Sequence, residues 1–255
     1  MNQLIICKDL RLFFGSYPRT ITEHSHPVIQ LIVAVEGCFL SKDDSGNWLS
    51  KNGLLIGPNH THECDARDVP IISVDIDPES SLGEWVLTNQ LKSQPILDYP
   101  HSDINPIDIK AFSDCVENQD WRALRSMIEN TFFFRKSNIE IEKDERIRDV
   151  LNFISEHIHE NITTERLMDV SHLSESRLIH LFKKEMGLPI RNYILWTRLQ
   201  IVFESILRGE SLTAASYEAG FSDQAHMTRT FTKMIGVPPS SVIKNSKFVQ
   251  VSFPE

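Results

Sequence analysis

The sequence predicts an α+β protein of two domains, with a β-rich N-terminal part and an all-helical C-terminal part. Three observations support this prediction. The chain has 255 residues, which is near the upper limit for one domain and enough to bury two cores. Short strand-like segments separated by turn residues fill residues 3–76. One helical pattern occurs twice in the last third of the chain, at an offset of 49 positions.

The N-terminal part reads as a series of short strands. Apolar or β-rich segments cover residues 4–6, 10–14, 28–35, 38–40, 53–56 and 70–76. Turn-forming residues such as Gly46, Gly57 and Pro58 separate them. Several short strands at this spacing favour a small β-barrel or sandwich, which we place in residues 1–80.

Residues 81–136 are expected to form a helical extension of the first domain. Its clearest helix covers residues 120–135, with Asp120 as a suitable N-cap. The apolar residues of this helix recur at three- and four-residue spacing: Trp121, Leu124, Met127, Ile128, Phe132 and Phe133. The helix either packs on its own barrel or also forms a dimer seam, because it is richer in aromatic residues than a barrel edge needs.

Composition points to a cytoplasmic protein. The four cysteines are widely spaced and form no paired motif, which suits free thiols in a reducing compartment. The N-terminus has no basic-then-apolar signal, and no apolar run is long enough to cross a membrane. The net charge is −9, but residues 164–255 carry 11 Lys and Arg against 9 Asp and Glu. The C-terminal part is therefore mildly basic and the remainder strongly acidic, and the position of the cations decides whether phosphate can bind.

A polar run over residues 137–146 is expected to be the linker to a second domain, residues 147–246. The first copy of the repeat covers residues 164–187. A short helix from 164 to 170 leads through a turn into a second helix, which Ser174 can cap and Gly187 can end. This is the helix-turn-helix arrangement, in which the second helix enters the DNA major groove.

The second copy covers residues 212–236 and repeats this order. Its lead helix runs from 212 to 219, Ser222 or Asp223 can cap its second helix, and the prolines after Gly236 cannot continue that helix. A long helix from 191 to 208 joins the copies and is apolar almost all round, as a helix between two modules should be.

The C-terminal part resembles the DNA-binding domain of AraC/XylS-type transcription regulators. The matching residues are Ser174, Leu178, Phe182, Lys183, Gly187, Tyr193, Arg198 and Leu199, followed by Gly220, Phe221, Met227, Thr228, Arg229, Thr230, Phe231, Gly236 and Pro238. The sequence departs from the family at Met168 and Ser216, where the lead helices usually carry small residues, and at Met227, where an aromatic residue is usual.

The resemblance implies roles for individual residues. The base-reading positions are Ser176, Ile179 and His180 in the first copy and Gln224, Ala225 and Arg229 in the second. The expected contacts to the DNA backbone are Ser174, Lys183, Lys184, Arg191, Ser222, Thr228 and Lys233. Gln suits adenine and Arg suits guanine, so we expect the second copy to discriminate more strongly between sequences. Arg198 lies in a mostly apolar helix, and we expect it to make an internal salt bridge.

The N-terminal part carries a histidine pattern that resembles the cupin motifs. His24 and His26 are followed by Gln30, where cupins usually have glutamate, and later by Pro58 and His62. An H-x-H pair on a strand places both imidazoles on one face, where a third histidine could complete a metal site. The resemblance implies an effector pocket lined by His24, His26, Gln30 and His62. The alternatives are a divalent metal on His24, His26 and His62, or incidental surface histidines.

Together these resemblances imply a bacterial transcription regulator with a cupin-like sensor domain and no catalytic residues. Its partners would be double-stranded DNA, a small-molecule effector, RNA polymerase and, if the 120–135 helix forms a seam, a second copy of the chain; no membrane is implied. Two rival readings stay open. One is a metal-dependent cupin enzyme with an appended helical module. The other is a protein-binding adaptor whose helix-turn-helix no longer contacts DNA.

Overall fold

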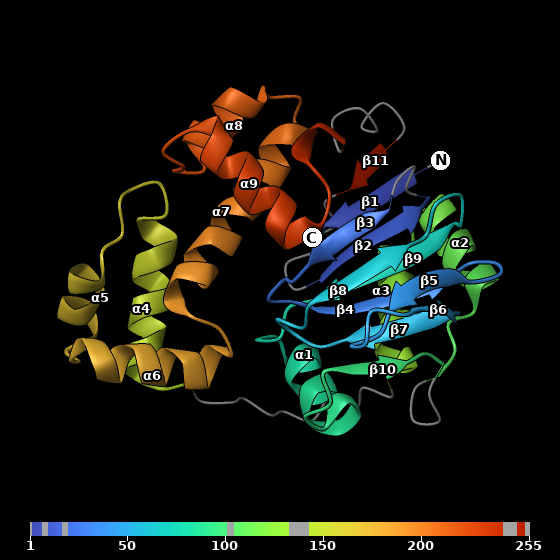
Figure 1. The fold of residues 1–255 in the computed structure, drawn as a ribbon, viewed down its shortest axis with the longest axis horizontal. Coiled ribbons are helices and arrows are strands. Elements are labelled where there is room, and N and C mark those ends of the chain that lie inside the picture. The colour runs from blue at the N-terminus through green and yellow to red at the C-terminus, as the bar shows by residue number, and fades with distance from the viewer. Residues whose placement is uncertain are drawn as a thin grey trace. The chain divides into compact units, whose positions relative to one another are not determined.

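The structure, a computed structural model, describes residues 2–6, 10–16, 20–100, 105–132, 143–241 and 249–252 (Figure 1). Packing divides the chain into two units. The sheet unit comprises residues 1–23, 28–139 and 248–255, and the helical unit comprises residues 24–27 and 140–247. The prediction of a two-domain α+β protein, with a sheet-rich N-terminal part and a helical C-terminal part, is confirmed.

The larger sheet of the sheet unit has seven strands. In spatial order these are β10 (Ile96–Asp98), β7 (Gly53–Ile56), β4 (Ile29–Ala34), β9 (Ile71–Ile76), β2 (Leu10–Gly15), β1 (Asn2–Ile6) and β11 (Val249–Ser252). Neighbouring strands are antiparallel except β1 and β11, which run parallel. The strand β11 comes from the C-terminal end of the chain, and nothing in its sequence predicted this pairing.

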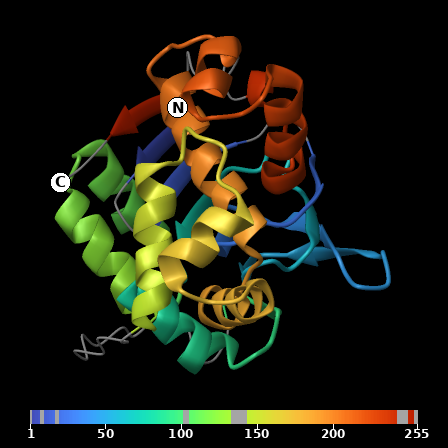
Figure 2. The same cartoon turned by 90° about the vertical axis from the view of Figure 1, so that its left-hand side faces the viewer.

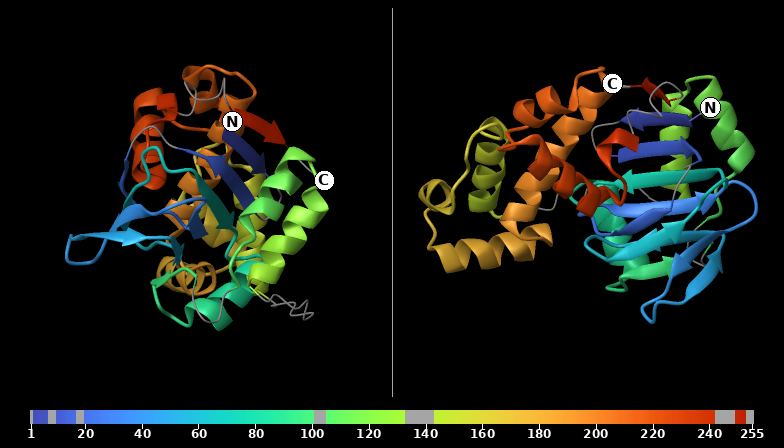
Figure 3. Two further views of the ribbon diagram at one scale, coloured as in Figure 1. Left: turned by 90° about the vertical axis from the view of Figure 1, so that its right-hand side faces the viewer. Right: turned by 45° about the horizontal axis from the view of Figure 1, so that its top comes forward.

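The smaller sheet has the order β3 (Ile21–His24), β8 (His62–Asp65), β5 (Phe39–Lys42) and β6 (Trp48–Lys51). Among the described strands neither sheet closes on itself, so the expected cupin-like barrel is not found. A barrel needs its first and last strands to pair, whereas here both sheets keep open edges. Buried apolar residues of both sheets instead pack in one cluster, which includes Ile32, Leu54 and Ile71 of the larger sheet and Phe39 and Cys64 of the smaller one. Figure 3 shows the strands of this unit from two further sides.

Strand β4 explains why residues 28–35 are almost continuously apolar. Its residues alternate between two cores: Ile29, Leu31 and Val33 join the core under the helices, whereas Ile32 and Ala34 join the layer between the sheets. A strand buried on both faces needs apolar residues at nearly every position. Gln30, on the same side as Ile32, interrupts the run because it donates hydrogen bonds to Asp75 Oδ1 at 3.0 Å and Ser73 Oγ at 3.3 Å.

Helices cover the outer face of the seven-stranded sheet. They are α1 (Ser81–Val86), the π-helix η1 (Leu87–Leu91), α2 (Ile109–Glu117) and α3 (Trp121–Thr131). The expected helical extension is interrupted by β10, which pairs with β7. Asp120 caps α3 as predicted, and its Oδ1 accepts a hydrogen bond from Ala123 N at 3.0 Å. Leu124 and Ile128 pack into the sheet core, so the apolar face of α3 covers its own sheet; residues 133–135 of the expected helix lie outside the described residues.

The helical unit consists of α4 (Glu145–Glu156), α5 (Thr164–Ser171), α6 (Glu175–Met186), α7 (Ile190–Leu207), α8 (Leu212–Glu218) and α9 (Gln224–Ile235); Figure 2 faces α4, α5 and α6. Helix α4 starts after its cap Asp144, so it begins inside the expected linker. Residues 137–142 of that linker lie outside the described residues. No described helix combines the length and apolar character that a membrane span requires.

Helix α7 holds the two copies of the repeat through matching aromatic contacts. Phe182 of α6 meets Tyr193 edge to face, with ring centroids 5.6 Å apart. Phe231 of α9, the equivalent residue of the second copy, stacks on Phe203 at 6.1 Å. Aromatic pairs of this kind add about 0.5–1.5 kcal/mol beyond their burial. The repeated phenylalanines therefore anchor both second helices to one central helix.

Ser216 of α8 occupies a core position and gives a stability prediction. Its side chain is fully buried, and its hydroxyl has no hydrogen-bond partner among the described residues. Ser216→Ala is expected to raise the free energy of unfolding by about 1 kcal/mol, because it removes an unsatisfied buried polar group. The urea midpoint of the full chain measures this.

Ser171→Ala is the matched control, since Ser171 is equally buried but donates to the Leu167 carbonyl at 2.7 Å. The control should not become more stable. Equal gains in both variants would contradict the explanation.

Candidate nucleic-acid interface

Helix α6 begins and ends where its sequence predicts. Leu178, Phe182 and Met186 are buried on one face, and Gly187 ends the helix at a φ of 70°. Ser174 occupies the N-cap position, but its side chain makes no capping hydrogen bond within the described part of the chain. The expected capping interaction is therefore absent, although the helix start is right.

Helix α9 has the same construction with a stronger cap. Asp223 Oδ1 accepts a hydrogen bond from His226 N at 2.7 Å. This backbone hydrogen bond is the main reason that the pKa of Asp223 lies below its usual value. Met227, Phe231 and Met234 are buried, and Gly236 ends the helix at a φ of 78°. Of the two caps that the sequence offered, Asp223 is the one used.

The buried faces of both helices leave an outward stripe. All six expected base-reading residues are exposed: Ser176, Ile179 and His180 on α6, and Gln224, Ala225 and Arg229 on α9. Ile179 is a large apolar residue and is 45% exposed. An exposed isoleucine among polar neighbours suits a surface that contacts the apolar edge of a ligand.

The expected backbone-contact residues are less uniform. Ser174, Lys183, Lys184, Arg191, Ser222 and Lys233 are exposed, whereas Thr228 is half-buried. The hydroxyl of Ser222 is also engaged with Asp223 Oδ2 at 3.2 Å and lies 3.4 Å from His226 Nδ1. The four cations of this set are therefore better placed for an anionic partner than Thr228 or Ser222.

Thr213 contacts one of the expected base-reading residues, and the sequence did not predict this contact. Its hydroxyl, on α8, donates to Gln224 Oε1 at 2.7 Å. The bond orients the amide at the first turn of α9. No sequence signal marks it, because the two residues lie on different helices and meet only when α8 and α9 pack.

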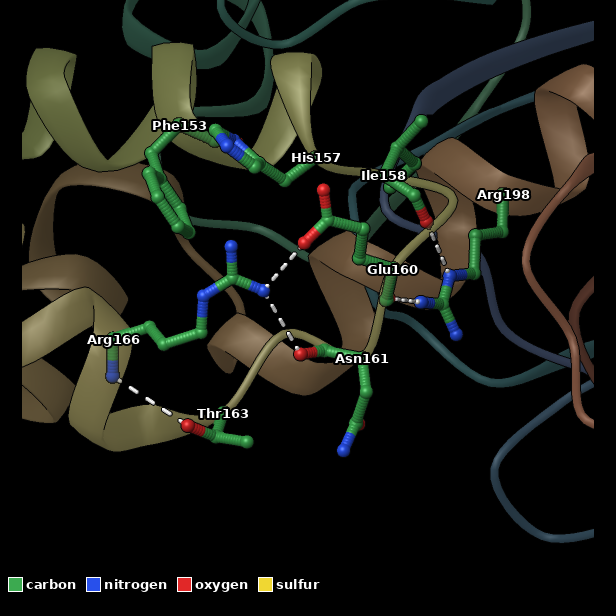
Figure 4. Close-up of polar contacts among 8 residues, drawn as sticks. All are labelled: Phe153, His157, Ile158, Glu160, Asn161, Thr163, Arg166 and Arg198. Carbon is green, nitrogen blue, oxygen red and sulfur yellow. Dashed lines mark hydrogen bonds and ion pairs between the residues drawn. The ribbon is translucent and has the colours of Figure 1, made fainter.

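Arg198 makes backbone contacts instead of the expected salt bridge. Its Nε donates to the Ile158 carbonyl at 3.0 Å and its Nη2 to the Glu160 carbonyl at 2.6 Å (Figure 4). Burial lowers the pKa of Arg198 from its usual value. Its guanidinium is therefore used within the protein, on the connection between α4 and α5.

The candidate effector residues lie at strand ends. His24 ends β3 and His62 begins β8, the neighbouring strand, whereas His26 follows β3 and is not on a strand as expected. All three histidines are buried. They are the group among the described residues that could hold a metal ion, with ring nitrogens within 4.8 Å of one another. Three imidazoles are a donor set that suits zinc or a similar divalent metal.

On the sheet unit's inner face, polar groups gather at one end of β4 and β9. The apolar layer between the sheets includes Ala34 and Ile71, which are opposite each other in register. Gln30 is opposite Asp75 at the other end of the same strand pair, and Arg11 of β2 is also opposite Asp75. The inner face therefore changes from apolar to polar along the strands.

The fold and the paired exposed stripes define a protein with two helix-turn-helix units. A family model described as a helix-turn-helix domain matches residues 167–245. The chain is 30% identical over 232 residues to the probable transcriptional regulator LumQ of Photobacterium leiognathi, covering 86% of this chain and 90% of that protein. It is 26% identical over 249 residues to the HTH-type transcriptional regulator YobQ of Bacillus subtilis, covering 93% and 92%. The chain belongs to the AraC/XylS family of transcription regulators.

Solved structures agree with the fold. An apo ToxT variant from Vibrio cholerae aligns with a TM-score of 0.61 over 92% of this chain and 96% of its own, at 12% identity. ToxT bound to an unsaturated fatty acid aligns with a TM-score of 0.50 at 12% identity, over 92% and 94%. The protein is a sequence-specific DNA-binding transcription regulator.

Proposed function

We propose that α6 and α9 enter successive stretches of the DNA major groove and read bases through their exposed stripes. The observation that carries this proposal is the matched exposure of Ser176, Ile179 and His180 on α6 and of Gln224, Ala225 and Arg229 on α9. An α-helix fits the major groove, where each base pair presents a distinct set of donors and acceptors.

The two helices would read DNA unequally. Arg229 can make two hydrogen bonds to guanine, and the Gln224 amide can pair with adenine. Thr213 holds the Gln224 oxygen on one side, which reduces the number of amide orientations that binding must freeze. On α6, Ile179 offers only apolar contact, which suits a thymine methyl group. The half of the site under α9 would therefore be the more strongly specified.

Phosphate contacts would come from the exposed cations Lys183, Lys184, Arg191 and Lys233. Ser174 could add a hydrogen bond from the first turn of α6, where the helix dipole favours an anion. Thr228 and Ser222 contribute less in this account, because one is half-buried and the other is already hydrogen-bonded.

Selection of duplexes from a random DNA pool by the purified full-length protein tests this proposal. We expect an enriched site with two parts one helical turn apart, of which the part under α9 varies less in sequence. A pool with no enriched sequence at low salt would support the adaptor reading. An enriched site with a single part would contradict the proposal that both α6 and α9 read bases.

Thr213→Val is expected to weaken discrimination at the base pair that Gln224 reads by roughly threefold, since the amide loses its fixed orientation. Competition between the selected duplex and one substituted at that base pair measures the change. Thr232→Val is the control, because the Thr232 hydroxyl donates to the Thr228 carbonyl on the same helix, at 2.9 Å. Equal losses in the two variants would contradict a specific role for Thr213.

We further propose that a small effector binds in the sheet unit and shifts the population of DNA-binding states. The support is the polar end of the inner face, where Gln30, Ser73 and Asp75 are hydrogen-bonded beyond an apolar layer. Of the four expected pocket residues, Gln30 and His62 belong to the sheet unit and are proposed to line this site, whereas His24 and His26 are grouped with the helical unit. ToxT, which shares the fold, binds an unsaturated fatty acid, so an effector with a carboxylate and an apolar tail is a reasonable first class to test.

Metal analysis of protein purified without a histidine tag distinguishes an effector pocket from a metal site at these histidines. We expect no stoichiometric metal in the wild type or in His24→Ala. One equivalent of metal in the wild type that is lost in the variant would establish a metal centre. Such a centre alone would not support the enzyme reading, which also needs turnover. We also propose that the protein acts with RNA polymerase, that it pairs with a second copy of the chain, and that it works in the cytoplasm.

A further inference from the structure

The connection between α4 and α5, residues 157–162, contacts both helix-turn-helix units. Toward the first unit, Arg166 of α5 binds it through one guanidinium nitrogen, Nη1, which donates to Glu160 Oε2 at 2.8 Å and to the Asn161 carbonyl at 3.2 Å. The Arg166 guanidinium also lies over the Phe153 ring of α4, 4.8 Å from its centroid. The start of α5 is thereby fixed to this connection.

Toward the second unit, the same connection is bound by α7 and α8. Arg198 of α7 holds the carbonyls of Ile158 and Glu160 at 3.0 and 2.6 Å. His159 Nδ1 hydrogen-bonds to the backbone carbonyl of Glu218, the last residue of α8. Gly220, in the turn before α9, approaches so closely that a Cβ there would lie 2.8 Å from the Ile158 carbonyl oxygen.

Figure 4 shows Arg166 and Arg198 reaching residues 158–161 from two sides. Helix α7 joins the two units covalently, and the second helix of each unit packs on it through one aromatic pair, Phe182 with Tyr193 and Phe231 with Phe203. The clamped connection adds a second link between them. Arg198 suits this role because its planar guanidinium can hold two carbonyls in one fixed geometry.

We propose that Arg198 is a positioning residue that fixes the spacing and rotation of α6 relative to α9, and so sets the distance between the two halves of the DNA site. The proposal rests on DNA binding by both helices. Arg198 itself does not contact DNA in this account, because its guanidinium is used within the protein.

The test compares Arg198→Met with the wild-type full-length protein on three duplexes: the selected site, the same site with one base pair inserted between its halves, and one with a base pair removed. The wild type should bind the altered duplexes at least about tenfold more weakly, because one helix leaves its bases. Arg198→Met should bind the selected site about tenfold more weakly, since rigid placement is lost. Its penalty for altered spacing should fall below about threefold.

The salt dependence separates positioning from phosphate contact. Arg198→Met should keep the wild-type salt slope, whereas Lys233→Met should reduce the slope by about 0.9 and keep the spacing penalty. An unchanged spacing penalty in Arg198→Met, or a reduced salt slope, would overturn the proposal. Failure of the wild type to bind any duplex would instead refute the DNA-binding proposal.

If circular dichroism shows that Arg198→Met does not fold, Arg198→Lys replaces it. Lysine keeps the charge but cannot hold both carbonyls in a fixed plane. We expect the spacing penalty of Arg198→Lys to lie between that of the wild type and the limit of about threefold given for Arg198→Met. A full wild-type penalty in Arg198→Lys would then count against the proposal.

Discussion

Gly220→Ala is expected to lower the stability of the helical unit by about 3 kcal/mol, from overpacking together with a left-handed backbone. Gly220 has a φ of 76°, which an L side chain rarely adopts. Its Cβ would also lie 2.8 Å from the Ile158 carbonyl oxygen and 2.9 Å from His159 Cα. Both are backbone atoms, so they cannot move aside by a change of rotamer.

Urea unfolding of the full chain, followed by circular dichroism at a helical wavelength, measures the loss. Gly209→Ala is the matched control, because Gly209 has a φ of 87° but no atom of the described residues lies within 4 Å of its Cβ position. It should cost only about 1 kcal/mol, the backbone part alone. Equal losses at the two positions would show that the close approach to residues 158–159 is unimportant.

Arg229→Ala is expected to reduce discrimination between the selected site and a scrambled duplex by roughly 5- to 150-fold, equivalent to about 1–3 kcal/mol. Arg229 is exposed on α9, with its helix fixed by the Asp223 cap and the buried Phe231. The guanidinium can therefore reach base edges without disturbing the core. Titrations of both duplexes at one salt concentration give the ratio.

Lys233→Ala is the contrasting variant on the same helix. Lys233 lies in the last turn of α9, and its loss should weaken both duplexes by the same factor. If Arg229→Ala instead left the ratio of the two affinities unchanged, Arg229 would be a backbone contact, and the assignment of α9 as the stronger reader would be wrong.

The helices of the DNA-binding unit were predictable because local signals agree with their packing. Gly187 and Gly236 end α6 and α9 with positive φ, and buried residues recur at helical spacing. The strands were harder to predict. β6 is exposed at nearly every residue, and β3 is mostly polar, so neither has the apolar pattern that marks a strand. Pairing of β11 with β1 joins opposite ends of the chain, which no local signal encodes.

The candidate site shows the same division. Exposure of Gln224 and Arg229 follows from the helical period once the buried face is known. The partners of Thr213 and Arg198 do not follow from the helical period, because their hydrogen bonds join different elements. Thr213 bonds to Gln224, 11 positions away, and Arg198 bonds to Ile158, 40 positions away. Arg198 shows the limit of local reasoning: an arginine in an apolar helix suggested a carboxylate partner, whereas backbone carbonyls of a packed turn satisfy it.

The salt dependence of binding to the selected duplex tests the central claim most directly. Four exposed cations, Lys183, Lys184, Arg191 and Lys233, are proposed to neutralise phosphates. The logarithm of the association constant should therefore fall with the logarithm of the salt concentration with a slope of about −3.6. A slope near zero would contradict DNA binding through these helices and favour a protein-binding adaptor.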